Sequence, residues 1–221
     1  MMNSALDGIG MTSLRTRMRM VDALRKRKIA NEAVLDAMLT VPRHIFVDEA
    51  LSSRAYEDNA LPLGFGQTLS QPYVVARMIE ALLGKRPGLG KTLEVGTGCG
   101  YQAAVLGCLT SEVWSVERIA PLLARARQHL DSIPGISVRL KHADGNVGLP
   151  EAAPFDSIIV AAAARQAPPG LLQQLAVGGC LILPLGGQDQ VLCHIERTPS
   201  GFVEKRLEKV RFVPLLPGIQ S

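Results

Sequence analysis

Residues 93–101 read LEVGTGCGY, and this stretch decides which fold the rest of the chain can adopt. A short apolar strand runs into a loop with glycine at every second position: Gly96, Gly98 and Gly100. A helix is predicted to begin at Tyr101. Glycines let the backbone turn sharply and approach a ligand closely, and the N–H groups at a helix start face that ligand. The stretch therefore predicts a cradle for a nucleotide cofactor, although its GxGxG spacing differs from the GxGxxG fingerprint of dinucleotide sites.

Acidic residues follow the next two predicted strands. Glu117 ends the strand after the glycine loop, where a carboxylate can accept hydrogen bonds from both hydroxyls of a ribose. That geometry suits a nicotinamide nucleotide and S-adenosylmethionine equally, and without the loop Glu117 would be read as a surface carboxylate. Asp144 and Gly145 close the third strand, where the aspartate either bonds an adenine amino group or forms a simple turn.

The pattern after residue 91 alternates short apolar strands with helical segments. The predicted strands are Thr92–Gly96, Val113–Glu117, Ser137–Ala143, Asp156–Ala162, Cys180–Gly186, Gln190–Glu196 and Leu207–Leu215. The predicted helices between them are Tyr101–Leu109, Ala120–Ser132 and Pro169–Ala176. This order predicts an α/β fold with a mostly parallel sheet and helices on both faces. The last two strands have no helix between them, which indicates an antiparallel edge.

The first part of the chain is predicted to be helical, with one long loop. Met11–Lys28 is basic and has Leu14, Met18, Val21 and Leu24 at helical spacing, so we expect an amphipathic helix with that apolar stripe on the core. Its basic face is either simply solvated or attracts a substrate or membrane.

A second helix is predicted over Asn31–Thr40, with Asn31 as its cap. Arg43–Pro72 reads as an extended loop, and Val74–Leu83 as a third helix. We expect residues 1–90 to form a helical and active-site loop region packed on a cofactor-binding core, residues 91–221, within one structural domain.

Composition limits the function classes. The chain has 221 residues, 47% hydrophobic and 20% charged, enough for a full-sized core. A formal net charge of +4 is far below the excess of a dedicated nucleic-acid binder. No apolar stretch approaches the roughly 18 residues of a membrane span, and no secretory signal is visible. The four cysteines match no CxxC metal pair. We expect a cytoplasmic monomer without a metal, nucleic-acid or membrane partner.

Residues 64–72 read GFGQTLSQP, in which hydroxyls alternate with an apolar residue. Pro72 favours an extended backbone at Gln71, and a period of two puts Thr68 and Ser70 on the same side, facing one ligand. An ordinary capped helix entry is the alternative. A hydrolase nucleophile is disfavoured because the chain has no GxSxG elbow.

Six stretches occur in an order that resembles one known family. They are VPRHIFV at 41–47, AYEDNALP at 55–62, GQTLSQP at 66–72, LEVGTGCGYQ at 93–102, PFD at 154–156 and FVPL at 212–215. From about Met18 to Leu216 the chain resembles the protein-L-isoaspartate O-methyltransferases. The glycine loop is shared with many methyltransferases, whereas GQTxSQP is specific to this family.

The resemblance implies a Rossmann-like methyltransferase fold with a seven-stranded sheet. It implies methyl transfer from S-adenosyl-L-methionine to the free α-carboxylate of L-isoaspartyl residues in damaged proteins and peptides, with S-adenosyl-L-homocysteine as the product. The ester then collapses to a succinimide, which can reopen as aspartate.

The resemblance also implies roles for residues at the matching positions. Ser70 is the active-site residue, Glu117 binds the ribose, and Asp144 with Gly145 takes the adenine end. The complete set of implied cofactor-binding residues is Thr68, Leu69, Ser70, Glu94, Gly96, Thr97, Gly98, Gly100, Glu117, Asp144 and Gly145. A carboxylate acceptor with a pKa near 4 is already ionised at pH 7, so Ser70 is expected to position it rather than to act as acid or base.

Three positions depart from the family pattern. Cys99 replaces a common serine, Phe65 replaces a frequent His or Tyr, and Leu216 replaces a Thr found in some relatives, so no cofactor contact is carried over to Leu216. Three alternatives stay open: a methyltransferase for a small molecule or RNA, a nicotinamide enzyme, and a non-catalytic cofactor-binding module.

Overall fold

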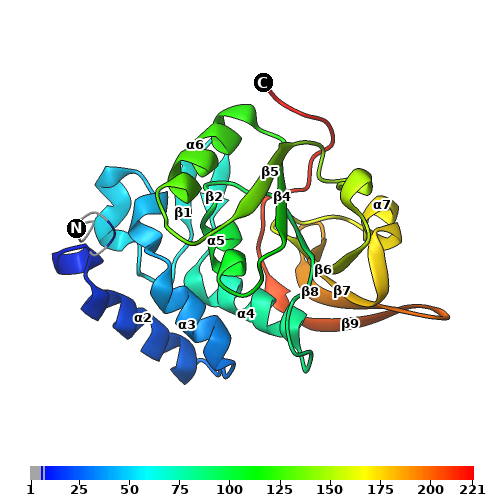
Figure 1. Ribbon diagram of the computed structural model, residues 1–221, viewed down its shortest axis with the longest axis horizontal. Coiled ribbons are helices and arrows are strands. Elements are labelled where there is room, and N and C mark those ends of the chain that lie inside the picture. Colours follow the sequence, from blue (N-terminus) through cyan, green and yellow to red (C-terminus); the bar gives the residue numbers. More distant parts are fainter. Residues whose placement is uncertain (1–5, 7) are drawn as a thin grey trace.

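The computed structural model describes residue 6 and residues 8–221, and its centre is one seven-stranded sheet (Figure 1). The strands follow the order β5-β4-β3-β6-β7-β8-β9. They are β3 Thr92–Val95, β4 Val113–Glu117, β5 Val138–His142, β6 Phe155–Val160, β7 Leu175–Gly186, β8 Gln190–Thr198 and β9 Gly201–Val210. Strands β3 to β7 are parallel, whereas β8 is antiparallel to both of its neighbours, β7 and β9. The predicted parallel sheet with an antiparallel edge is therefore confirmed.

Helices cover both faces of this sheet, as predicted (Figure 1). The helices are α2 Leu14–Lys26, α3 Glu32–Thr40, α4 Pro72–Leu83, α5 Tyr101–Gly107, α6 Ala120–Asp131 and α7 Pro169–Gln173. One apolar core joins α2 to α6 with one face of the sheet, and a second joins α7 and the short helix Pro150–Ala152 with the other. Because side chains alternate along a strand, Leu93 and Val95 enter the second core while Glu94 faces α5.

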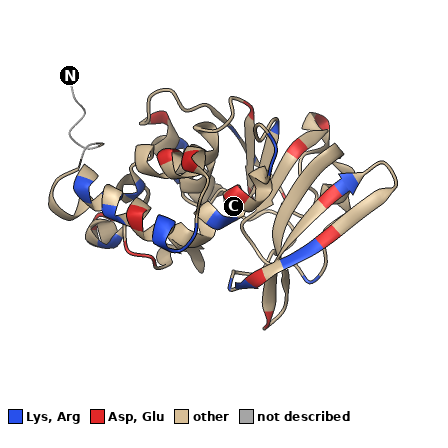
Figure 2. Cartoon of the chain, turned by 90° about the horizontal axis from the view of Figure 1, so that it is seen from below, with Lys and Arg blue, Asp and Glu red and all other residues tan. Residues whose placement is uncertain are grey.

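The final strand differs from its prediction. It begins earlier, after a tight turn at Pro199 and Ser200, and it ends at Val210 instead of Leu215. Residues beyond Val210 leave the sheet edge: the Phe212 N–H donates to the Gln190 side chain, and the chain then makes backbone hydrogen bonds with Ala163. Charged residues of both signs follow one another along the exposed β9 (Figure 2).

Helix α2 forms as expected but buries a different stripe. Leu14 and Met18 are 55% and 52% exposed, so their predicted burial is wrong, whereas Met20 is buried together with Val21 and Leu24. Arg17 is also buried, and its guanidinium donates to the Thr40 carbonyl at the end of α3. The stripe is rotated because α2 packs its 17, 20, 21 and 24 positions against α3 and α4. Figure 2 shows that basic residues recur along this helix.

Helix α3 is confirmed, and the Asn31 side chain accepts a hydrogen bond from the Val34 N–H at 3.2 Å as its cap. Helix α4 is also confirmed. No helix in the described part of the chain is long and apolar enough to span a membrane.

The predicted extended loop over Arg43–Pro72 is wrong in part, because the segment contains ordered elements. Two short 3₁₀ helices, Arg43–Phe46 and Glu49–Arg54, precede a small antiparallel hairpin of β1 Leu61–Gly64 and β2 Gln67–Leu69. Its turn holds Gly64, Phe65 and Gly66 at positive φ of 84°, 53° and 68°. Glycine adopts this backbone without strain, which explains the glycines on either side of Phe65.

Candidate active site

A cleft opens at the carboxyl ends of β3, β4 and β6, where parallel sheets bind ligands. The glycine loop forms one wall, the β1–β2 hairpin a second, and the chain after β9 a third. Its lining residues are Leu63, Gln67, Thr68, Leu69, Ser70, Val75, Val95, Gly96, Thr97, Gly98, Cys99, Tyr101, Gln102, Val116, Glu117, Arg118, Ile119, Gly145, Ala161, Ala162, Val213, Pro214, Leu215 and Leu216. The structure thus brings together eight of the predicted residues: Thr68, Leu69, Ser70, Gly96, Thr97, Gly98, Glu117 and Gly145. It does not place Glu94, Gly100 or Asp144 on the lining.

The glycine loop has the backbone that its sequence predicts. Gly96, Gly98 and Gly100 all have positive φ, at 93°, 56° and 92°. A Cβ on Gly98 would meet Leu63 of the hairpin at 3.4 Å, so the hairpin lies directly on the loop. A Cβ on Gly100 would lie 3.3 Å from both Ala126 and Leu130. Gly100 therefore serves the close packing of α5 on α6 instead of lining the cleft.

Glu117 is buried at the end of β4 and holds the glycine loop in place. One of its carboxylate oxygens accepts the Gly98 N–H at 2.9 Å, and the other accepts the Ile119 N–H at 3.0 Å. Each carboxylate oxygen can accept about two hydrogen bonds, so both keep capacity for a ligand's hydroxyls. The side chain can brace the loop and bind a diol at the same time.

Glu94 lies beneath the loop, not on its surface. It is fully buried and accepts hydrogen bonds from Gln102 at 3.1 Å and from the Ser115 hydroxyl at 2.5 Å. The Ser115 hydroxyl lies 2.6 Å from that of Thr97. Burial raises the pKa of Glu94 to about 8, against the opposing effect of these two hydrogen bonds. Glu94 therefore supports Thr97 through Ser115.

Asp144 ties down the end of the chain. Its carboxylate accepts the Asn146 N–H at 2.8 Å and the Gly218 N–H at 2.6 Å. Partial burial acts to raise the pKa of Asp144, but these N–H donors outweigh it and hold the pKa below its ordinary value. A Cβ on Gly145 would lie 2.4 Å from a Val95 methyl, so only glycine allows the chain after β5 to approach β3 this closely.

Arg43 is a site residue that the sequence reasoning did not single out. It is completely buried, donating at 2.7 Å to the Ala55 carbonyl and at 2.7 Å to the Ser70 carbonyl. Its guanidinium also lies over the Tyr101 ring, 4.7 Å from the centroid. Burial lowers the pKa of Arg43 from its ordinary value. The Arg43 guanidinium thus joins the Ser70 segment to the start of α5. The sequence feature that could have indicated its burial is an arginine inside the mostly apolar stretch VPRHIFV.

The tail, residues 211–221, was also missed as a wall of the cleft. Gln190 clamps Phe212 by accepting its N–H at 2.6 Å and donating to its carbonyl at 3.1 Å. Ala163 then donates to the Val213 carbonyl and accepts the Leu215 N–H, both at 2.8 Å. These bonds bring Leu216 to the lining of the cleft, at a position to which the family's cofactor contact was not carried over.

A second groove adjoins the cleft at Ser70. Its lining residues are Arg27, Ala60, Thr68, Ser70, Gln71, Tyr73, Val74, Arg77, Ala161, Leu192, Glu208, Lys209, Val210, Arg211, Phe212 and Val213. Thr68 and Ser70 line both cavities, as their shared side in the sequence predicts, and Ala161 and Val213 do so too. The arrangement can bring a ligand in the cleft together with a second molecule in the groove.

Comparison with protein-family models gives a match to protein-L-isoaspartate(D-aspartate) O-methyltransferase over residues 15–220. The chain belongs to this family. It is 66% identical to the protein-L-isoaspartate O-methyltransferase of Dechloromonas aromatica, over 97% of this chain and 100% of that protein. It is 59% identical to the same-named protein of Methylobacillus flagellatus, over 99% of each chain.

Solved structures of the family share its fold. A protein-L-isoaspartate O-methyltransferase superimposes with a TM-score of 0.81 at 26% identity, covering 90% of this chain and 65% of that one. A putative family member from Plasmodium falciparum, solved in complex with S-adenosyl-L-homocysteine, gives a TM-score of 0.75 at 26% identity, covering 90% of this chain and 98% of that one. These matches confirm the expected Rossmann-like methyltransferase fold.

Proposed function

We propose that this family member transfers a methyl group from S-adenosyl-L-methionine to the free α-carboxylate of L-isoaspartyl residues in damaged proteins and peptides. The products are S-adenosyl-L-homocysteine and a methyl ester that collapses to a succinimide, from which aspartate can re-form. The observation that carries the proposal is the meeting of two cavities at Thr68 and Ser70. A transfer reaction needs a donor site and an acceptor site that share one boundary.

The cleft suits the methyl donor. Glu117 offers two acceptor oxygens to the ribose hydroxyls, and the loop from Gly96 to Gly98 allows a close backbone approach. Gly145 lines the side assigned to adenine, while Asp144 fixes the tail beside it. We assign Glu94 and Gly100 supporting roles behind the loop.

The donor supplies a methyl group on a positively charged sulfur, and the chain's residues do the positioning. An acceptor carboxylate is ionised at pH 7, so no residue need remove a proton. Ser70 would orient the acceptor or the donor for in-line attack, with its own backbone fixed by Arg43. The hairpin and the tail form walls of the cleft. Orientation of this kind lowers the activation free energy of a bimolecular reaction by about 7 to 11 kcal/mol where the geometry is ideal.

The experiment uses labelled S-adenosyl-L-methionine with an isoaspartyl peptide and its aspartyl twin. A base-labile methyl ester should form on the isoaspartyl peptide and hardly at all on the twin. Equal rates on both peptides would contradict the repair function, and base-stable label on RNA would favour another class of methyltransferase. Calorimetry with the donor and with NAD tests the cofactor, since tight binding of NAD alone would exclude the proposal.

A further inference from the structure

The groove beside Ser70 is lined by more cations than carboxylates. Four of its lining side chains are basic and one is acidic: Arg27, Arg77, Lys209, Arg211 and Glu208. The groove therefore presents positive charge to whatever approaches Ser70.

Two of these cations are compensated within the protein. Arg77 pairs with Glu208 at 2.9 Å, and the Tyr73 hydroxyl donates to the same carboxylate at 3.0 Å. Arg27 pairs with Asp58 and stacks over the Tyr73 ring at 3.5 Å. These groups form a fixed wall rather than free charges.

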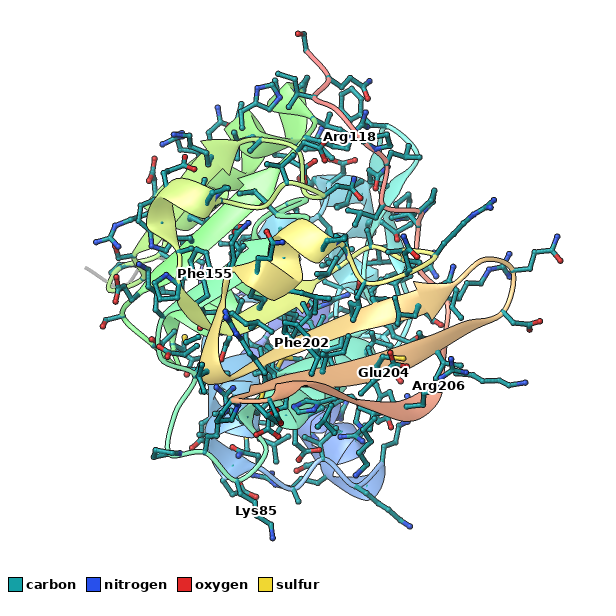
Figure 3. The ribbon with its side chains drawn as sticks, turned by 90° about the vertical axis from the view of Figure 1, so that its right-hand side faces the viewer. Lys85, Arg118, Phe155, Phe202, Glu204 and Arg206 are labelled. Carbon is teal, nitrogen blue, oxygen red and sulfur yellow. The ribbon has the colours of Figure 1, made fainter. Side chains whose placement is uncertain are left out.

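Lys209 and Arg211 are different. Both are exposed, and over residues 8–221 neither has an ion-pair partner within 4.0 Å. Arg206, which precedes Lys209 on β9, instead pairs with Glu204 at 3.4 Å (Figure 3). The Gln190 clamp fixes Phe212, the residue directly after Arg211. Two uncompensated cations are thus held at the rim of the groove.

We propose that Lys209 and Arg211 make the groove selective for isoaspartyl peptides whose neighbouring residues are acidic. This inference rests on the proposed function, because it assigns the groove to the acceptor peptide. Opposite charges raise the local concentration of an anionic peptide and slow its release, while the reacting atoms at Ser70 are unaffected. The selectivity should therefore be seen in KM, with kcat unchanged.

The test uses three isoaspartyl peptides that differ only in glutamate, glutamine or lysine at the flanking positions. At low salt the wild-type kcat/KM should fall from the acidic to the neutral peptide by about two- to thirtyfold, the range for two exposed ion pairs, and fall again for the basic one. The double variant Lys209→Glu, Arg211→Glu should reverse that order. Salt at 1 M, where the Debye length is about 3 Å, should remove the preference.

The control is Lys85→Glu, Arg15→Glu, which changes the net charge equally at two exposed residues that do not line the groove. Lys85 projects from the end of the molecule opposite the labelled Arg118 (Figure 3). This variant should keep the wild-type order. Equal kcat/KM for all three peptides in the wild type, or the same reversal in the control, would overturn the proposal. An absence of methyl transfer to every peptide would instead refute the proposed function, so the two failures are distinguishable.

Discussion

The cleft and the groove beside it meet at Ser70 but are built in different ways. The cleft is braced from behind by buried polar groups: Glu94, Glu117 and Arg43 are each 5% exposed or less. The groove is walled by an edge strand whose charged residues are mostly exposed. Buried hydrogen-bonded groups fix a geometry, whereas exposed charges change affinity by small amounts. The comparison predicts large effects from changes behind the cleft and small ones from changes along the groove.

The largest effect is expected for Arg43→Met. It removes the hydrogen bonds to the buried Ala55 carbonyl and the partly buried Ser70 carbonyl and leaves both acceptors unpaired, at about 1 to 3 kcal/mol each. We expect the free energy of unfolding to fall by about 2 to 6 kcal/mol, and methyl transfer to fall with it. Urea unfolding and initial rates measure the two effects. Arg54→Met, at an exposed arginine, is the control, and equal stability of the two variants would contradict the bracing role.

Glu117→Ala should come next and act on the cofactor. Loss of hydrogen bonds to a charged group weakens binding by about 1.5 to 3 kcal/mol, and the Gly98 and Ile119 N–H groups also lose their acceptor. Calorimetry with S-adenosyl-L-homocysteine measures the change. The control is Glu112→Ala, which removes an exposed glutamate beside the other end of β4. This variant should bind S-adenosyl-L-homocysteine with the wild-type affinity. Unchanged affinity in Glu117→Ala would show that the diol site lies elsewhere.

Ser70→Ala should lower turnover with little loss of cofactor affinity. One lost hydrogen bond to a charged group, about 1.5 to 3 kcal/mol, corresponds to a fall of roughly 10- to 150-fold. Rates at saturating donor test this, with Ser53→Ala as a matched loss of an exposed hydroxyl. Wild-type turnover would remove Ser70 from the site, and a methyl-seryl enzyme found by mass spectrometry would replace direct transfer with a two-step mechanism.

A further prediction concerns pH and the carboxyl group of Glu94 behind the cleft. Burial raises the pKa of Glu94 to about 8 from an ordinary 4.5, so between these values unfolding releases a proton that the folded protein holds. Wild-type stability should therefore fall relative to Glu94→Gln as the pH rises from about 5 to 8, by at most about 1.4 kcal/mol per pH unit, and then level off. Urea unfolding across this range measures it, with Glu151→Gln as an exposed control. Parallel stability curves for wild type and Glu94→Gln would show that the folded protein does not hold this proton.

Local sequence predicted the parts of the fold whose causes are local. The strand Val113–Glu117 and the glycine loop were predicted correctly because a short, mostly apolar run and the glycine spacing indicate them locally. The hairpin over residues 61–69 was missed because its strands are too short to show a period. Burial of Arg43 and exposure of Leu14 depend on partners far along the chain, which no local pattern records.

The predicted site residues also divide into those whose position follows from local sequence and those whose side-chain direction depends on distant partners. Gly96 to Gly98 and Thr68 to Ser70 line the cleft, because the backbone that carries them also forms the wall. Glu94 and Asp144 lie at the right ends of their strands, but their side chains are used by Gln102, Ser115 and Gly218. Long-range hydrogen bonds decided the direction of these two side chains, and so their roles. The division into residues 1–90 and 91–221 stays a prediction, although one apolar core contains residues from both parts.

The position of the tail has a consequence for limited proteolysis. All but a few members of the two apolar cores precede Val210. Val213 to Leu216 form one wall of the cleft, and Gly218 and Gln220 anchor this segment to Asp144 and Ile119. A chain cleaved after Val210 should therefore keep its sheet and lose its cleft.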